Sequence, residues 1–302
     1  MTFRNLTLFR LSPAVADDLS RLDEALPEHK LRSVGPLELS TRGFVSPLGL
    51  GSDALTHSVG CCTMVAVGSE SRMLPSSVVN DELAKRVQKI VDEEGRKVSG
   101  RERKRVKDDV LNELLPRAFA KASRMRAYAD KKNGWFVVDT ASRARAEDVL
   151  SQIREALGSF PAIPLAPEES PRILMTHWIA SGDLPAGLAL GDEIELRDPA
   201  TASGAIARCR RQDLDTDEVR EHLRTGKQVF SLGLLFDDRI SFVLGEDLIV
   251  RKLRFTDVVL DEHADDHESA VVEADANFAL MSLEYQRLLA KLAEWFKLRR
   301  PG

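Results

Sequence analysis

The sequence predicts an α+β fold with mixed α/β domains, antiparallel sheets and a protruding helical hairpin. Three observations lead to this class. Residues 3–75 alternate β-prone runs with a short helical segment, residues 76–115 follow a helical period, and residues 227–255 hold three successive β-prone runs. With 302 residues, 43% hydrophobic and 30% charged, the chain is long enough to bury sizeable cores.

Composition excludes several classes of protein. No run approaches the 18 consecutive apolar residues of a membrane-spanning helix, and no charged-then-apolar leader precedes a small-residue cleavage site. The three cysteines, of which Cys61 and Cys62 are adjacent, cannot build a disulfide framework. We therefore expect a cytoplasmic protein without a membrane partner.

The first region is expected to begin with a strand and a helix. A long loop with five Gly or Pro residues then surrounds a short strand, and a β-prone run follows. The expected ranges are strand Phe3–Leu11, helix Pro13–Leu26, loop Gly35–Gly60 and strand Thr63–Val67.

Two helices joined by a short basic loop predict a hairpin that protrudes from the domain. The first has an apolar stripe at helical spacing from Val79 to Ile90 and ends at Gly95. The second helix begins at a capping box. The Ser99 side chain is expected to accept a hydrogen bond from a free backbone N–H of the first turn, and the Glu102 side chain from the backbone N–H of Ser99. Pro116 is expected to begin a third helix.

Further along, the pattern returns to mixed elements. Two prolines restrict one strand to an edge or a bulge, and the segment from Ala166 to Pro171 is the best linker candidate. The expected strands are Trp135–Asp139, Phe160–Leu165, Leu190–Leu196, Ala205–Arg210 and the meander Lys227–Phe236, Ile240–Leu244 and Leu248–Phe255; the expected helices are Ser142–Leu157, Ile173–Ala180 and one from Thr216.

The last expected helix, about Phe278 to Leu298, carries a two-heptad apolar seam. Its members are Met281, Tyr285, Leu288, Leu292 and Trp295. Two heptads fall short of the three to four that indicate a coiled coil. The seam therefore fits either a helix packed on its own domain or a contact with a second chain.

Charge is segregated along the chain. Between Lys85 and Lys132 there are 16 Lys/Arg against 8 Asp/Glu, a local net charge of +8 in a chain of net charge −5. Residues 257–284 contain nine Asp/Glu and no Lys or Arg. A chain that is acidic overall can therefore present a basic surface to a polyanion, although solvated helix faces would give the same pattern.

The common catalytic constellations are missing. Gly226-Lys227 lacks the rest of a phosphate-binding loop. His263 and His267 lie four residues apart, as two metal ligands on one helix face would, and carboxylates surround them. The sequence shows no third positioned ligand, which a catalytic zinc site needs. Asp53, His57 and Cys61 recur at four-residue spacing, but the glycines around them favour a structural role. We therefore expect no enzyme, no catalytic residues, no metal and no cofactor.

Two basic clusters are candidates for DNA contact. Arg117, Lys121 and Arg124 recur at i, i+4 and i+7 on the helix expected after Pro116, with Phe119 in its first turn. Arg208, Arg210, Arg211 and Gln212 end an expected strand. Arg and Lys neutralise phosphates, and no base-reading motif accompanies them, so the expected binding is independent of sequence.

Several sequence blocks occur in order over nearly the whole chain: Ser52 to His57, Met73 to Ser76, Leu114 to Phe119, Val138 to Ser142 with Ala146 to Asp148, Leu157 to Ser159, Gln212 to Leu214, and Asp275 to Met281. Together these blocks resemble the bacterial recombination-associated protein RdgC family.

The resemblance implies a non-enzymatic, nucleoid-associated protein that binds double-stranded DNA. In the family, two protomers close into a ring-shaped homodimer around the duplex and restrain RecA. Carried over by position, Arg117, Phe119, Arg211 and Gln212 are DNA-facing or ring-closing side chains. The unusually arginine-rich segment Gly95 to Lys107 departs from the family and affects the contact between protomer tips.

These inferences together define three expected units. They are a central α+β domain of residues 1–75 plus 116–166, a helical tip hairpin of residues 76–115, and a C-terminal α+β domain of residues 171–302 with a dimerising last helix. The alternative function is a protein-interaction module that acts directly on a recombinase, with incidental basic patches.

Overall fold

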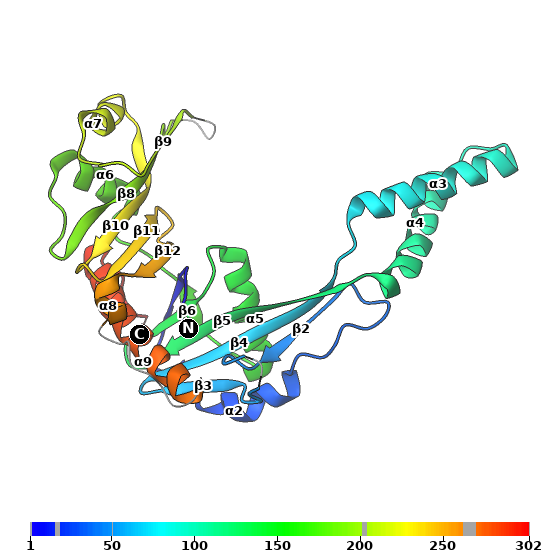
Figure 1. Cartoon of the computed structure of the whole chain (residues 1–302), viewed down its shortest axis with the longest axis horizontal. Helices are drawn as coiled ribbons and strands as arrows, with labels where there is room; N and C mark the ends of the chain where they lie inside the picture. The colour runs from blue at the N-terminus through cyan, green and yellow to red at the C-terminus, as the bar shows by residue number, and fades with distance from the viewer. Residues whose placement is uncertain (1, 16–18, 50, 201–203, 262–269, 302) are drawn as a thin grey trace.

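The computed structural model describes residues 2–15, 19–49, 51–200, 204–261 and 270–301. Two antiparallel sheets lie side by side, and a helical hairpin extends far from them, so that the chain forms an open crescent (Figure 1). The α+β class, the antiparallel sheets and the protruding hairpin are confirmed. No helix in the described ranges is long and apolar enough to cross a membrane.

The first sheet has seven antiparallel strands. Six follow the order β2-β4-β5-β6-β1-β7, and β3 pairs with β4. Their bounds are β1 Thr7–Leu11, β2 Ser40–Val45, β3 Thr56–Val59, β4 Cys62–Arg72, β5 Ala120–Asp130, β6 Trp135–Val138 and β7 Ala162–Pro164. The proline-rich strand β7 lies at the edge of the sheet, as its sequence predicts.

Both faces of this sheet are buried at its base. In β6, Trp135 and Val137 belong to one apolar core while Phe136 and Val138 belong to another, as the alternation of side chains in a strand requires. The second core is closed by α5 (Arg143–Leu157), whose Ser142 cap accepts a hydrogen bond from the N–H of Arg145. The short helices η1 (Leu19–Arg21), α2 (Leu22–Ala25) and η2 (Leu26–His29) also pack there.

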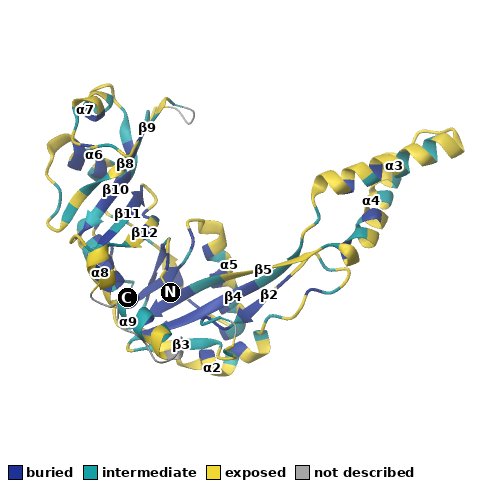
Figure 2. Cartoon of the chain, in the orientation of Figure 1, coloured by how far each residue is buried: buried dark blue, intermediate teal, exposed yellow. Residues whose placement is uncertain are grey.

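Strands β4 and β5 continue beyond this core as a long ribbon, and β2 pairs with the other edge of β4 from Ala66 to Ser71. Their pairing runs unbroken from Cys62 opposite Asp130 to Arg72 opposite Ala120. The ribbon is buried at its base and exposed toward the hairpin of α3 (Ser76–Glu94) and α4 (Gly100–Leu114) (Figure 2). Ser99 accepts from the N–H of Glu102, so the predicted cap is present.

The third helix expected from Pro116 is wrong. Pro116 lies in the short 3-10 helix η3 (Leu115–Arg117), and the chain then enters β5. Alanine-rich sequence favours helix locally, but eleven paired residues along β4 supply more hydrogen bonds than a free helix beside the hairpin would. Tertiary pairing decides this segment against its local period.

Smaller differences concern the first 60 residues. In its described part, the single helix expected over Pro13–Leu26 is divided into the short helices η1, α2 and η2. The loop from Gly35 to Gly60 contains two strands, β2 and β3, where one was expected. Gly43 is required in β2 because a Cβ there would lie 2.5 Å from the backbone nitrogen of Leu31.

The second sheet has five antiparallel strands in the order β12-β11-β10-β8-β9. Helices α6 (Pro171–Ser181) and α7 (Asp217–Arg224) cover its apolar face. The strand bounds are β8 Leu188–Arg197, β9 Ile206–Arg210, β10 Gln228–Phe236, β11 Ile240–Gly245 and β12 Val250–Phe255. The predicted meander is therefore confirmed, and the short helix α8 (Asp257–Asp261) follows it.

The last helix, α9 (Ala270–Trp295), joins the two sheets into one core. Tyr285 donates a hydrogen bond to the carbonyl of Phe3 at 2.8 Å, and reciprocal backbone bonds connect Leu6 with Val250. Four seam residues, Met281, Tyr285, Leu288 and Leu292, are at most 1% exposed within the single chain. These four residues therefore pack on their own chain, and the fifth, Trp295, is partly buried against the same core.

Candidate nucleic-acid interface

The first basic cluster lies on the exposed part of the ribbon. Arg117 ends η3, and Lys121 and Arg124 lie in β5, all three exposed. Because successive side chains in a strand alternate, Lys121 and Arg124 lie on opposite faces of the ribbon. The single helical stripe expected for the three residues is therefore wrong, because Arg117 lies in η3 and the other two lie on opposite faces of β5.

These three cations form no ion pair in the described part of the chain, although Arg117 interacts electrostatically with Glu113. Within the described ranges, no carboxylate oxygen lies within the 4.0 Å ion-pair limit of Arg117, Lys121 or Arg124. By contrast, Arg126 nearer the core donates to the carbonyl of Pro47 at 2.9 Å, and burial lowers its pKa. The exposed ribbon is therefore a source of positive charge that anions can reach.

A groove on the Lys121 face adds polar groups that sequence reasoning did not identify. It lies between the ribbon and α5 and is lined by Arg42, Ser69, Ser71, Lys121, Ser123 and Arg145, among others. The hydroxyls of Ser69 and Ser123 lie 2.8 Å apart, and Arg42 pairs with Asp148 at 3.2 Å. Because residues from β2, β4, β5 and α5 line this groove, no local sequence motif could have predicted it.

Apolar side chains are exposed where the ribbon meets the hairpin. Phe119 is 85% exposed, and Leu37, Leu39 and Met73 are each more than half exposed. The N–H of Met73 donates to the carbonyl of Phe119 at 2.7 Å, and the N–H of Arg72 donates to Leu39. The first bond holds Met73 next to Phe119, and the second holds Leu39 next to Arg72. Phe119, Met73, Leu39 and Leu37 are called here the apolar patch.

The second basic cluster lies on the face of the second sheet that α6 and α7 leave open. Here the arginines are paired with carboxylates of the neighbouring strand. Arg208 donates to Glu195 at 2.6 Å, and Arg210 lies 4.0 Å from Glu193. Arg197 also donates to Glu195, and Lys252 donates to Glu193.

The pKa of Glu195 reflects the charge pairing on this face. Burial acts to raise the pKa of Glu195, but the hydrogen bonds from Arg208 and Arg197 outweigh burial and lower it. Glu195 is therefore ionised at neutral pH and remains a competitor for the arginines. An anion that approaches Arg208 must displace this carboxylate.

Arg211 and Gln212 lie just beyond β9. Arg211 has a left-handed backbone (φ 57°), and the N–H of Gln212 donates to the carbonyl of Asp192 at 3.4 Å. In the described part of the chain, no carboxylate pairs with Arg211. The ribbon and the second sheet occupy separate arms of the crescent, so one chain does not bring the two basic clusters together (Figure 1).

Of the three histidines with catalytic or metal-ligand spacing, the structure describes only His57. Asp53, His57 and Cys61 do not share a helix, because His57 lies in strand β3. Its Nε2 lies 3.1 Å from Asp275, and its ring contacts Phe278. His263 and His267 lie outside the described residues.

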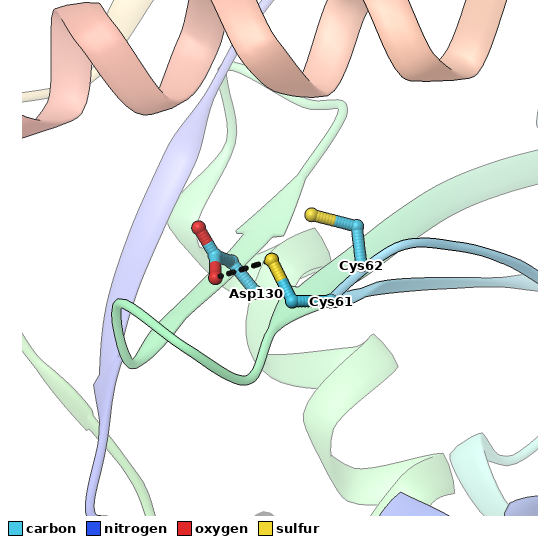
Figure 3. A group of neighbouring side chains, drawn as sticks. All are labelled: Cys61, Cys62 and Asp130. Atoms are coloured by element: carbon cyan, nitrogen blue, oxygen red, sulfur yellow. Dashed lines mark hydrogen bonds between the residues drawn. The ribbon is translucent and has the colours of Figure 1, made fainter.

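A corner of the first sheet gathers two thiols and a carboxylate (Figure 3). Cys61 and Cys62 lie where β3 turns into β4, and Asp130 ends β5; their ligand atoms all lie within 4.8 Å of one another. Burial, and secondarily the Asp130 carboxylate, raise the pKa of Cys62 to about 12. Cys62 is therefore protonated at neutral pH and is not a thiolate nucleophile.

The fold and the surface together define a structural class. The chain is a two-sheet α+β protein whose long ribbon presents exposed cations without a described ion-pair partner. A family model described as "Putative exonuclease, RdgC" matches residues 1–299. The chain is 48% identical to recombination-associated protein RdgC of Xanthomonas campestris pv. campestris (strain B100) and 49% identical to that of Stenotrophomonas maltophilia (strain R551-3), with 99% of each chain covered. The chain belongs to the RdgC family.

Proposed function

We propose that this protein binds double-stranded DNA without sequence specificity, as a homodimer that encloses the duplex, and thereby restrains RecA-dependent recombination in the nucleoid. One observation carries the proposal: Arg117, at the end of η3, and Lys121 and Arg124, on the ribbon, are exposed and form no ion pair with a described carboxylate. The relatives are named recombination-associated proteins, which supports a role in recombination.

The ribbon suits the sugar-phosphate backbone. Lys and Arg release counterions from DNA when they neutralise phosphates, and hydroxyls such as Ser69 and Ser123 donate to phosphate oxygens. No base-reading motif accompanies these groups in the sequence. Affinity should therefore depend strongly on salt and weakly on DNA sequence.

The crescent shape favours a second copy as the partner that completes the enclosure. A closed pair would retain DNA without a tight grip at any one contact. The apolar patch at the end of the ribbon is suited to that contact, because exposed apolar clusters mark association surfaces.

Replacing Phe119 by Ala should weaken self-association at least 10-fold and leave folding unchanged, because this side chain is 85% exposed. Analytical ultracentrifugation over a concentration series measures this effect. The matched control is Ile173→Ala, another exposed apolar residue that lies on α6. Equal self-association of the two variants would contradict the role of the patch.

We propose binding rather than catalysis. Nucleases that hydrolyse phosphodiesters commonly hold metal ions with carboxylates. Within the described residues, the one group of three metal-capable side chains contains two cysteines and one aspartate. End-labelled duplex and single-stranded DNA should stay intact when incubated with the protein and Mg²⁺ or Mn²⁺; release of nucleotides would overturn this part of the proposal.

DNA affinity is tested with a variant of the ribbon. Arg117→Ala/Lys121→Ala/Arg124→Ala should weaken duplex binding on the order of 100-fold and flatten the log–log salt dependence by about 2.7, at roughly 0.9 per phosphate contact. Fluorescence anisotropy between 50 and 200 mM salt, as an approximate range, measures both. The matched control, Lys291→Ala/Lys297→Ala/Arg299→Ala, removes the same charge near the end of α9. Equal losses in the two variants would refute the assignment to the ribbon.

The same ribbon variant separates the two explanations of recombinase inhibition. If the protein acts by occupying DNA, the variant should lose inhibition of RecA strand exchange in proportion to its loss of DNA affinity. Inhibition that persists would indicate direct contact with the recombinase instead.

A further inference from the structure

The corner that holds Cys61, Cys62 and Asp130 has a composition that DNA binding does not require. The three residues come from the β3–β4 turn and the end of β5, and α9 passes beside them. Gln286 of α9 lies with its amide nitrogen 3.4 Å from Sγ of Cys61 and 3.5 Å from Sγ of Cys62. Four side chains from three separate segments thus converge on one point.

We propose that Cys61, Cys62, Asp130 and Gln286 form a binding site for one thiophilic divalent cation of the zinc class. Two thiolates select soft or borderline cations over Mg²⁺ and Ca²⁺, which take oxygen ligands. Rotation of the Gln286 amide by 180° places its oxygen where the nitrogen now lies and supplies the fourth donor.

The distances fit a tetrahedral ion. With metal–sulfur distances of about 2.3 Å and metal–oxygen distances of about 2.1 Å, a tetrahedron has sulfur–oxygen edges of about 3.6 Å. The Cys61 Sγ to Asp130 Oδ1 distance is 3.6 Å, and the two Gln286 distances are 3.4 and 3.5 Å. These three distances match the edges of such a tetrahedron, and the other distances among the two thiols and the carboxylate are at most 4.8 Å, so binding an ion requires shifts of roughly 1 Å.

The surroundings orient the carboxylate. Asp130 is fully buried, and its two oxygens accept from the N–H and the side-chain amide of Asn133 at 3.0 and 2.8 Å. Such a hydrogen-bonded second layer fixes the direction of a ligand and raises its affinity for metal. The turn between β5 and β6 thus holds Asp130 in place before any ion binds.

The charge also balances. On binding, the ion displaces the two thiol protons; two thiolates and one carboxylate then carry −3, so a divalent ion leaves −1. Arg10 is 7% exposed, lies over the Trp135 ring at 4.0 Å and donates to the carbonyl of Asn133 at 3.1 Å. Its guanidinium, which interacts electrostatically with Asp130, supplies the remaining positive charge.

A bound ion would connect α9 to the first sheet, because Gln286 belongs to the helix and the other three ligands belong to the sheet. It would therefore stabilise the junction between the two sheets and leave the basic ribbon unaffected. This role is independent of DNA binding, and its test does not involve DNA.

The test uses the full chain, purified with a phosphine reductant and stripped of metal, with Co²⁺ as the spectroscopic probe and Zn²⁺ as competitor. We expect one Co²⁺ per chain, a thiolate-to-cobalt charge-transfer band, displacement by Zn²⁺, and an increase in Tm of roughly 5 °C when Zn²⁺ exceeds its Kd about 100-fold. Absence of binding at micromolar Zn²⁺, or a disulfide between Cys61 and Cys62 under reducing conditions, would overturn the proposal.

Variants locate the ion. Cys61→Ser, at a half-buried position where folding should tolerate it, should raise the Kd for Co²⁺ at least 100-fold and abolish the charge-transfer band, and Cys62→Ser should do the same. The matched control is Cys209→Ser, because Cys209 is buried on β9 of the other sheet. Unchanged binding in Cys61→Ser, or equal loss in Cys209→Ser, would place the ion elsewhere and refute the site.

Discussion

The ribbon and the open face of the second sheet both carry basic side chains, but these side chains differ in whether a carboxylate pairs with them. On the ribbon, Arg117, Lys121 and Arg124 have no described carboxylate within ion-pair distance. On the sheet, Arg208 and Arg210 face Glu195 and Glu193 across a strand pair.

This difference shows that the number of cations on a surface does not measure its attraction for phosphate. A cation that is already paired must lose its carboxylate partner before it gains a phosphate, so the net gain is small. An unpaired exposed cation gives the full counterion-release effect. We therefore expect the ribbon to supply most of the affinity and the sheet to supply a weaker contact.

The largest expected effect on DNA affinity within this comparison comes from replacing the arginines at β9 of the second sheet. Arg208→Ala/Arg210→Ala/Arg211→Ala should weaken DNA binding on the order of 10-fold, less than the equivalent ribbon variant, because of these three only Arg211 lacks a described carboxylate partner. Anisotropy titrations at one salt concentration compare the two variants. A larger loss from the sheet than from the ribbon would reverse the ranking.

A smaller effect of opposite sign comes from the carboxylates. Glu193→Gln/Glu195→Gln should tighten DNA binding several-fold and steepen the salt dependence by about 0.9 for each cation that newly reaches a phosphate. Glu168→Gln/Glu169→Gln, which removes the same charge from residues that pair with Arg299 and Lys297, is the control. Unchanged affinity in the sheet variant would show that DNA does not approach this face.

The smallest expected effect concerns pH. Because the pKa of Glu195 is lowered below its ordinary value, its ion pairs are complete above that value and are lost only as pH falls through the folded-state pKa. Between pH 8 and 6, the affinity difference between the Glu193→Gln/Glu195→Gln variant and the wild-type chain should therefore stay constant. Convergence of the two at pH 6 would mean that another group controls the pairing.

Part of this architecture follows from the sequence because its signals are local. The cap at Ser99, the helix Arg143–Leu157 with its Ser142 cap, the edge strand β7 and the meander β10–β12 each depend on residues a few positions apart. The local excess of positive charge also follows from counting alone, and part of it, on the ribbon, stands unpaired. Family membership, indicated by ordered blocks across the chain, agrees with the comparisons.

The tertiary structure decided what depends on distant partners. The spacing of Arg117, Lys121 and Arg124 fits a helix, but pairing with β4 makes residues 120–130 a strand and turns two of these side chains to opposite faces. The heptad seam of α9 fits a dimer, but two sheets of the same chain bury it. Pairing of Arg208 with Glu195, and convergence of Gln286 on Cys61 and Cys62, join segments that are 13 and more than 200 residues apart. Local propensity accounts for elements with strong nearby signals, whereas the pairing and burial of residues remote in the chain decide the strand at residues 120–130 and which side chains remain free to act.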